Sequence, residues 1–239
     1  MSEPSNIPWN RILVEGVAIV ASILIAFAID AWWDDRKESE SEIHDLIRVS
    51  AELESNSGRI ETKLQTIALS IEATATFISW MGPEPANVEK ETLVKQWDSL
   101  YGIGFFSLHR SATGDYLASG RTDIAKNLEV RQAISEWYSI GIALEEQYER
   151  LRIAHANISA YLQDAIPFLQ TISANALMAD HPSSKFPFDQ TDLLADPKLE
   201  SRLALFLIRM EFVREQAVDL KERQQELVAL IDNTIEELD

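Results

Sequence analysis

The chain has 239 residues and a formal net charge of −18, from 21 basic and 39 acidic side chains. This excess of negative charge repels phosphate backbones and excludes nucleic acid as an expected partner. Cysteine is absent, which excludes disulfides, thiolate metal sites and a cysteine nucleophile. With only 8 Gly and 8 Pro, the composition predicts an all-α protein, in which a single N-terminal transmembrane helix continues into an elongated antiparallel helical bundle.

The first predicted element follows an N-terminal tail of residues 1–11 and is a transmembrane helix over residues 12–33. Its only ionisable side chains between Ile12 and Ala31 are Glu15 and Asp30, each near one end. The run has about the 20 residues needed to cross the hydrocarbon core of a bilayer. The sequence therefore predicts a single-pass membrane protein whose first partner is the lipid bilayer.

Tryptophans flank this apolar run. Trp9 precedes it, and Trp32 and Trp33 follow it, at positions where aromatic rings settle at the two membrane interfaces. A cleaved signal peptide is the alternative, because Ala26-Phe27-Ala28 resembles a small-residue cleavage site. We favour a retained anchor, since only one basic residue precedes the run.

One face of the predicted transmembrane helix is small and polar at intervals of three or four residues. Small residues let a second helix approach closely, and ionisable groups near the membrane face protein or water. The pattern predicts a packing face for another membrane protein or a second copy. The alternative is a simple anchor whose carboxylates reach the lipid headgroups. The residues of this face are Glu15, Ala18, Ser22, Ala26 and Asp30.

Residues 34–239 are predicted to form the helical bundle domain, and its first rod covers about residues 34–80. Seam residues there alternate at spacings of three and four, as in a coiled coil. The rod has no proline, and Gly58 is its expected soft point, at about 1 kcal/mol relative to alanine. The predicted seam is Ile43, Leu46, Ser50, Leu53, Ser57, Ile60, Leu64, Ile67, Ile71, Thr74 and Ile78.

A connector with short helices is predicted over residues 88–121. It begins with a helix from about Lys90 to Leu100, and continues through the apolar stretch YGIGFFSLHR (residues 101–110), which we interpret as a connector packed against the bundle rather than a strand. A second short helix then ends at Gly120, since glycine best accepts the left-handed conformation that closes a helix.

Two further rods are predicted, over about residues 128–178 and 197–238. Asn127 suits the N-cap of the first, and Pro167 should kink it. A polar and proline-rich loop, residues 180–197, leads to the last rod, where Pro197 suits the first turn. The seam of the first of these rods is Ile134, Trp137, Gly141, Leu144, Tyr148, Leu151, His155, Ile158, Leu162, Ala165, Leu169, Ile172 and Ala176. The seam of the last rod is Val213, Ala217, Leu220, Gln224, Leu227, Ile231, Thr234 and Leu238.

Two groups of residues resemble a family. The first is Glu15-Gly16, Ile23-Leu24-Ile25-Ala26, Ile29-Asp30, Trp32, Arg36 and Lys37, and the second is Ser119-Gly120, Asn127, Arg131 and Trp137-Tyr138. Both are similar to motifs of an uncharacterised group of small bacterial proteins with one N-terminal transmembrane helix and a helical domain. The resemblance covers about a fifth of the chain and implies no activity. The chain departs from that pattern at Val130, at Trp137 and in its few basic residues before the span.

The resemblance implies a location in the bacterial inner membrane with the helical domain in the periplasm. The sequence itself does not decide the orientation, because the basic residues on the two sides of the span are nearly balanced. Arg11 precedes the span, and Arg36 and Lys37 follow it closely.

No catalytic or metal-binding motif is present. The histidines His44, His109, His155 and His181 lie far from one another, so helical zinc and di-iron signatures are missing, and we expect neither cofactor nor metal. His155 falls on a seam, where one polar residue can fix the helix register. The remaining candidates for a small anionic ligand are His109, Arg110, Ser119 and Arg121, although we favour arginines that cap helix ends and pair with the acidic surface.

These observations favour a non-enzymatic, membrane-anchored accessory or scaffold protein. It would interact through the small face of the transmembrane helix and the surfaces of the bundle, as a subunit of a larger or homo-oligomeric membrane assembly. The alternative is an envelope sensor, in which a small anionic molecule near Arg110 and Arg121 reorganises the bundle. An enzyme ranks last, because no acid–base or metal constellation is recognisable.

Overall fold

The computed structural model describes residues 9–100, 103–119, 128–165, 184–187 and 189–238. The described residues form helices and connecting segments without any strand, as the composition predicts. The elements in chain order are α1 (Trp9–Ser79), α2 (Lys90–Leu100), α3 (Ser111–Ala118), α4 (Leu128–Ala165), α6 (Gln190–Leu194) and α7 (Pro197–Leu238).

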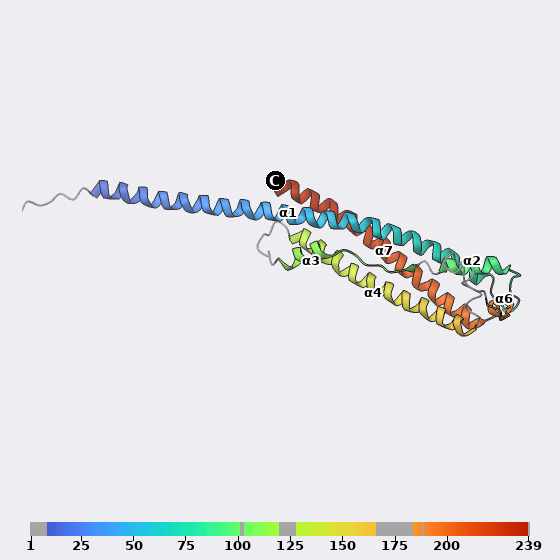
Figure 1. The fold of residues 1–239 in the computed structure, drawn as a ribbon. Helices are drawn as coiled ribbons and strands as arrows, with labels where there is room; N and C mark the ends of the chain where they lie inside the picture. The colour runs from blue at the N-terminus through green and yellow to red at the C-terminus, as the bar shows by residue number, and fades with distance from the viewer. Residues whose placement is uncertain (1–8, 101–102, 120–127, 166–183, 188, 239) are drawn as a thin grey trace, which may run out of the picture.

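Helix α1 is a continuous helix of 71 residues. Its first part projects alone beyond the other helices, and its second part is one wall of the bundle (Figure 1). Side chains from Leu13 to Ser41 are almost all exposed, and the first buried residue is Glu42. The prediction of one uninterrupted rod is therefore confirmed, and Gly58 does not break it.

Three long helices set the architecture. Helices α1 and α4 run in the same direction, away from the N-terminus, and α7 runs back antiparallel to both (Figure 1). Helix α7 packs against α1 on one side and against α4 on the other. Its buried Gln224 donates a hydrogen bond from Nε2 to the carbonyl oxygen of Leu53 on α1, at 2.7 Å. This bond fixes the relative register of the two helices.

A fourth layer lies against α1 and α4 and contains little helix. Helix α2 packs on α1 near the far end, and α3 packs on α1 and α4 near the end where α1 enters the bundle (Figure 1). Residues 103–110 lie between them in the chain and have no helical structure after Ile103. We call residues 103–110 the return segment. With this layer the chain has up-down-up-down connectivity, in which α2, the return segment and α3 together make the second pass along the bundle.

Two glycines allow the return segment to fit. Gly104 has a φ of +54°, a left-handed conformation that side-chain-bearing residues rarely adopt. Gly141 on α4 is buried where Leu108 of the return segment crosses it, and a Cβ at Gly141 would lie only 3.0 Å from the Leu108 Cδ1 atom. The absence of a side chain at Gly141 therefore lets the return segment approach α4 closely.

The described seam residues of α4 and α7 are buried except for the half-buried His155 and Leu238, whereas about half of the α1 seam is only half-buried. Positions such as Ser50, Ser57 and Ile71 are half-buried. At these positions the fully buried residue lies one place earlier in the chain, because α2, the return segment and α3 pack against α1 there. Because several of these earlier residues are polar, the hydrophobic periodicity of the sequence does not indicate them. They are Glu42, Val49, Asn56, Ser70 and Phe77.

The loop predicted for residues 180–197 contains a short helix, α6. The Asp189 carboxylate accepts a hydrogen bond from the backbone N–H of Thr191 at 2.8 Å and caps this helix. Leu193 and Leu194 then turn into the core. The predictions for Gly120, Asn127, Pro167 and residues 166–178 fall outside the described residues.

Candidate functional site

The return segment is held to α1 by a buried asparagine. The Asn56 side chain is fully buried, donates from Nδ2 to the carbonyl oxygen of His109 at 2.7 Å, and accepts at Oδ1 from the N–H of His109 at 2.8 Å. Both backbone groups of His109 are thus satisfied by one side chain. This amide takes the place of the neighbouring strand or helical turn that would normally pair with them.

A lysine and a tyrosine bind the start of the return segment. Lys63 on α1 donates from Nζ to the carbonyl oxygen of Ile103 at 3.1 Å, and the Tyr148 hydroxyl on α4 donates to the same oxygen. Burial lowers the pKa of Lys63 and raises the pKa of Tyr148 to about 12. Ile103 therefore joins α1 to α4 through its backbone oxygen.

On α4, Glu145 fixes the other end of the return segment. Its carboxylate accepts from the N–H of Leu108 at 2.6 Å and forms an ion pair with Arg110 at 2.7 Å. The Arg110 guanidinium also lies over the ring of Tyr138, 5.5 Å from its centre. The charge of Arg110 is thus neutralised inside the fold rather than offered to a ligand.

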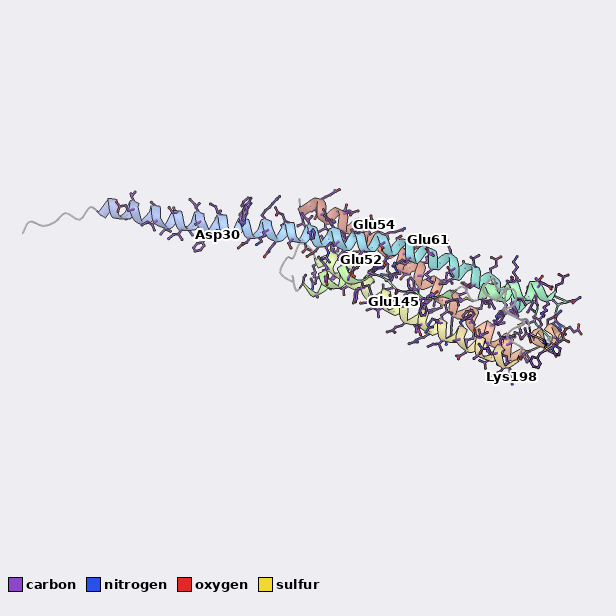
Figure 2. All side chains as sticks on the ribbon, viewed as in Figure 1. Asp30, Glu52, Glu54, Glu61, Glu145 and Lys198 are labelled. Carbon is purple, nitrogen blue, oxygen red and sulfur yellow. The ribbon has the colours of Figure 1, made fainter. Side chains whose placement is uncertain are left out.

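Glu52 on α1 caps the N-terminus of α3 from outside that helix. Its carboxylate accepts from the N–H groups of Ala112 and Thr113, at 2.8 and 3.0 Å, and from the hydroxyls of Thr113 and Ser111. Figure 2 places Glu52 beside α3 and Glu145 on α4. Burial alone would raise the pKa of Glu52, but these hydrogen bonds outweigh it and its pKa lies below the ordinary 4.5.

We expect Glu52→Gln to lower the free energy of unfolding by about 1–2 kcal/mol at pH 7, because the charge-assisted bonds to α3 are lost. Since the folded-state pKa of Glu52 is depressed, its contribution is present above about pH 4.5 and is lost as the pH falls through the folded-state value. Urea unfolding at several pH values measures the difference, which should shrink on acidification. The exposed Glu54→Gln on the same helix is the control and should change little.

The predicted ligand cluster is not assembled as an open site among the described residues. The His109 backbone is bound to Asn56, and Arg110 is paired with Glu145. The Ser119 hydroxyl donates to the carbonyl oxygen of Tyr116 at 2.7 Å, at the end of α3. Arg121 lies outside the described residues.

The predicted membrane-packing residues all lie on the projecting part of α1. Figure 2 labels Asp30 on this part. The hydroxyl of Ser22 donates to the carbonyl oxygen of Ala18 at 2.8 Å, so it is satisfied within its own helix. Trp32 and Trp33 are 62 and 63% exposed and stand next to one another. The side chain of Trp9 lies outside the described residues. The remaining members, Glu15 and Ala26, are exposed on the same helix.

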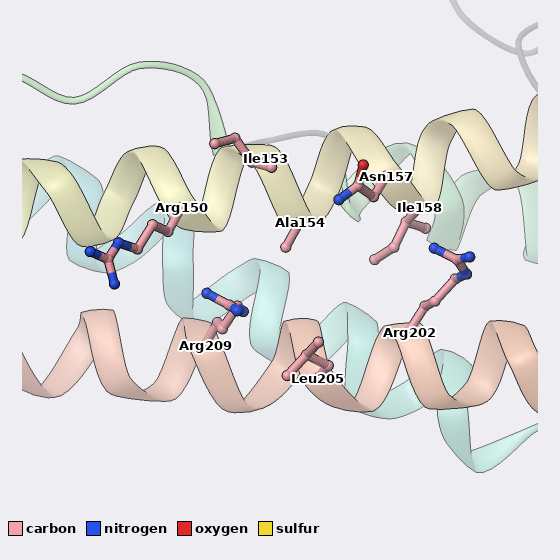
Figure 3. Close-up of a pocket in the computed structure, with 8 residues that line it drawn as sticks. All are labelled: Arg150, Ile153, Ala154, Asn157, Ile158, Arg202, Leu205 and Arg209. Atoms are coloured by element: carbon pink, nitrogen blue, oxygen red, sulfur yellow. The ribbon is translucent and has the colours of Figure 1, made fainter.

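A groove that the sequence did not predict lies between α4 and α7. It has a volume of about 290 Å³ and contains no Asp or Glu among its lining residues. Three arginines surround an apolar centre (Figure 3). The lining residues are Arg150, Ile153, Ala154, Asn157, Ile158, Arg202, Leu205 and Arg209. The signal that could have found it is the seven-residue spacing of Arg202 and Arg209, which places both on one side of α7.

No group of three metal-binding side chains occurs within the part of the chain that the structure describes. His155 is half-buried on α4, with its ring 5.7 Å from that of Phe206, and burial lowers its pKa. It packs as a core histidine of the kind that a seam position predicts.

No protein-family model, curated protein or solved structure matches this chain.

Proposed function

We propose that this protein is a membrane-anchored accessory or scaffold protein without enzymatic activity. Its anchor would lie in a bacterial inner membrane and its bundle in the periplasm, within a larger or homo-oligomeric membrane assembly. The observation that carries the proposal is the continuity of α1, which is long and apolar enough at its N-terminal end to cross a membrane and forms a wall of the bundle at its other end.

The side chains of the apolar part support this proposal. No part of its most apolar window is buried inside the protein, and Val20, Leu24 and Phe27 are each more than half exposed. Such a surface is costly in water and favourable in lipid. The bundle buries a continuous apolar core of its own, and its surfaces would bind other proteins.

The proposal is tested with the full-length chain in its native membranes. We expect it to resist a carbonate wash and, after gentle detergent extraction, to migrate as a complex larger than one chain. External protease should cleave the bundle only when the periplasm is opened. Release by carbonate, or a monomer at every concentration with no co-purifying protein, would contradict the proposal. Cleavage only after lysis of the inner membrane would place the bundle on the other side.

A further inference from the structure

The groove between α4 and α7 has an apolar centre whose large side chains are unusually exposed to solvent. Ile153 on α4 is 52% exposed and Leu205 on α7 is 50% exposed. The apolar surface continues along α7 through Ile208 and Phe212, which are 66 and 48% exposed. Large apolar side chains that gather on one surface of a soluble domain mark an interaction site more often than isolated ones do.

The charges around this groove are positive in a strongly negative chain. The guanidinium groups of Arg150 and Arg209 point into the space between the helices at one end, and Arg202 lies at the other end (Figure 3). Elsewhere most arginines pair with carboxylates, as Arg152 does with Glu149. Within the described residues these three have no carboxylate at ion-pair distance, and the buried Arg209 Nε atom has no hydrogen-bond partner.

The arrangement decides what kind of partner fits. Arg202 and Arg209 are seven residues apart, about 10 Å along α7, or two helical turns. A small anion could pair with the arginines but would leave Leu205 and Ile153 uncovered. A helix with an apolar stripe flanked by carboxylates would satisfy both features, as in other grooves that bind amphipathic helices. Groove-to-groove pairing of two copies would bring like charges together, which is unfavourable.

We infer that the groove between α4 and α7 docks an acidic amphipathic helix of a partner protein. This inference rests on the proposed scaffold function, because it assigns the partner surface of that scaffold. The apolar stripe of the partner would cover Ile153 and Leu205, and its carboxylates would pair with Arg150 and Arg209.

The test places the photo-crosslinker p-benzoylphenylalanine at position 205 of the full-length chain in native membranes. A second version carries it at position 69, because Leu69 is 65% exposed on α1 and outside the groove. The crosslinked peptides are then sequenced. We expect the adduct at position 205 to contain an acidic segment with apolar residues at helical spacing, and position 69 not to yield that segment.

Charge variants make the test specific. Arg150→Gln with Arg209→Gln should reduce the adduct at position 205 about tenfold, since arginines in interfaces contribute strongly to binding. The matched control is Arg152→Gln with Arg214→Gln, because both arginines pair locally on exposed surfaces, and it should leave the adduct unchanged. Arg209→Glu should abolish the adduct, and exchange of the crosslinked partner's facing carboxylate for arginine should restore it.

Several outcomes would overturn the inference. One is that position 205 forms adducts only with lipid, only within its own chain or only with a second copy of the chain. Another is an adduct that the double glutamine variant does not reduce. If a partner crosslinks at position 69 but none at position 205, the groove assignment is wrong while the scaffold function stands. If carbonate releases the chain as a monomer, the scaffold function itself fails.

Discussion

Replacement of Asn56 with alanine is expected to lower the free energy of unfolding by about 2–4 kcal/mol, one of the largest effects of any single substitution in the bundle. The Asn56 side chain makes two hydrogen bonds to the backbone of His109 from a fully buried position. Its removal breaks both part-buried hydrogen bonds to the His109 backbone, which costs about 1–2 kcal/mol for each.

Urea unfolding of the full-length chain in detergent, followed by circular dichroism, measures this effect. The control is Ser57→Ala, the next residue on the same helix, which is half-buried and should change the free energy by less than about 0.5 kcal/mol. An Asn56→Ala protein as stable as the wild type would mean that the return segment is held to α1 by packing alone.

Two arginines introduced by substitution into the apolar part of α1 should have a comparably large effect on membrane insertion. Val20 and Leu24 lie one turn apart and are 56 and 62% exposed. Each arginine near the centre of a span costs about 2.5–3.5 kcal/mol for insertion, so Val20→Arg with Leu24→Arg should shift the chain out of the carbonate-resistant membrane fraction.

Carbonate extraction of newly made chain and a glycosylation reporter fused to the C-terminus report this shift independently. The paired apolar exchange Val20→Leu with Leu24→Val keeps the hydrophobicity and should insert normally. If the double arginine variant inserts as well as the wild type, α1 does not cross the bilayer at these residues, and the proposed anchor is wrong.

The long helices could be predicted from the sequence because their periodicity is strong and no glycine or proline interrupts α1 between Gly58 and Ser79. Helix α2 and the start of α7 at Pro197 follow from equally local signals, a proline-rich break and a first-turn proline. Each of these features depends on residues within about one or two helical turns, so the local sequence is enough to predict it.

The phase of the α1 seam depends on tertiary structure instead. Asn56 can be buried because its side-chain amide hydrogen-bonds to the backbone of His109, 53 residues later. A hydrophobic pattern cannot predict such a pairing. Arg110 pairs with Glu145 on α4, 35 residues later, and the local sequence around Arg110 does not predict this partner. The groove of Arg150 and Arg209 likewise joins residues 59 positions apart.

The unbroken course of α1 has a mechanical consequence. From Asp34 to Ser79 the helix extends about 68 Å, and a change of 10° in its inclination would move the distal end by about 12 Å. With the stem embedded in lipid, a neighbour that tilts the span by this small angle would carry the arginine groove sideways by roughly the width of a helix. If the proposed anchoring holds, the stem would act as a lever that converts a small rearrangement among membrane segments into a large displacement far from the bilayer.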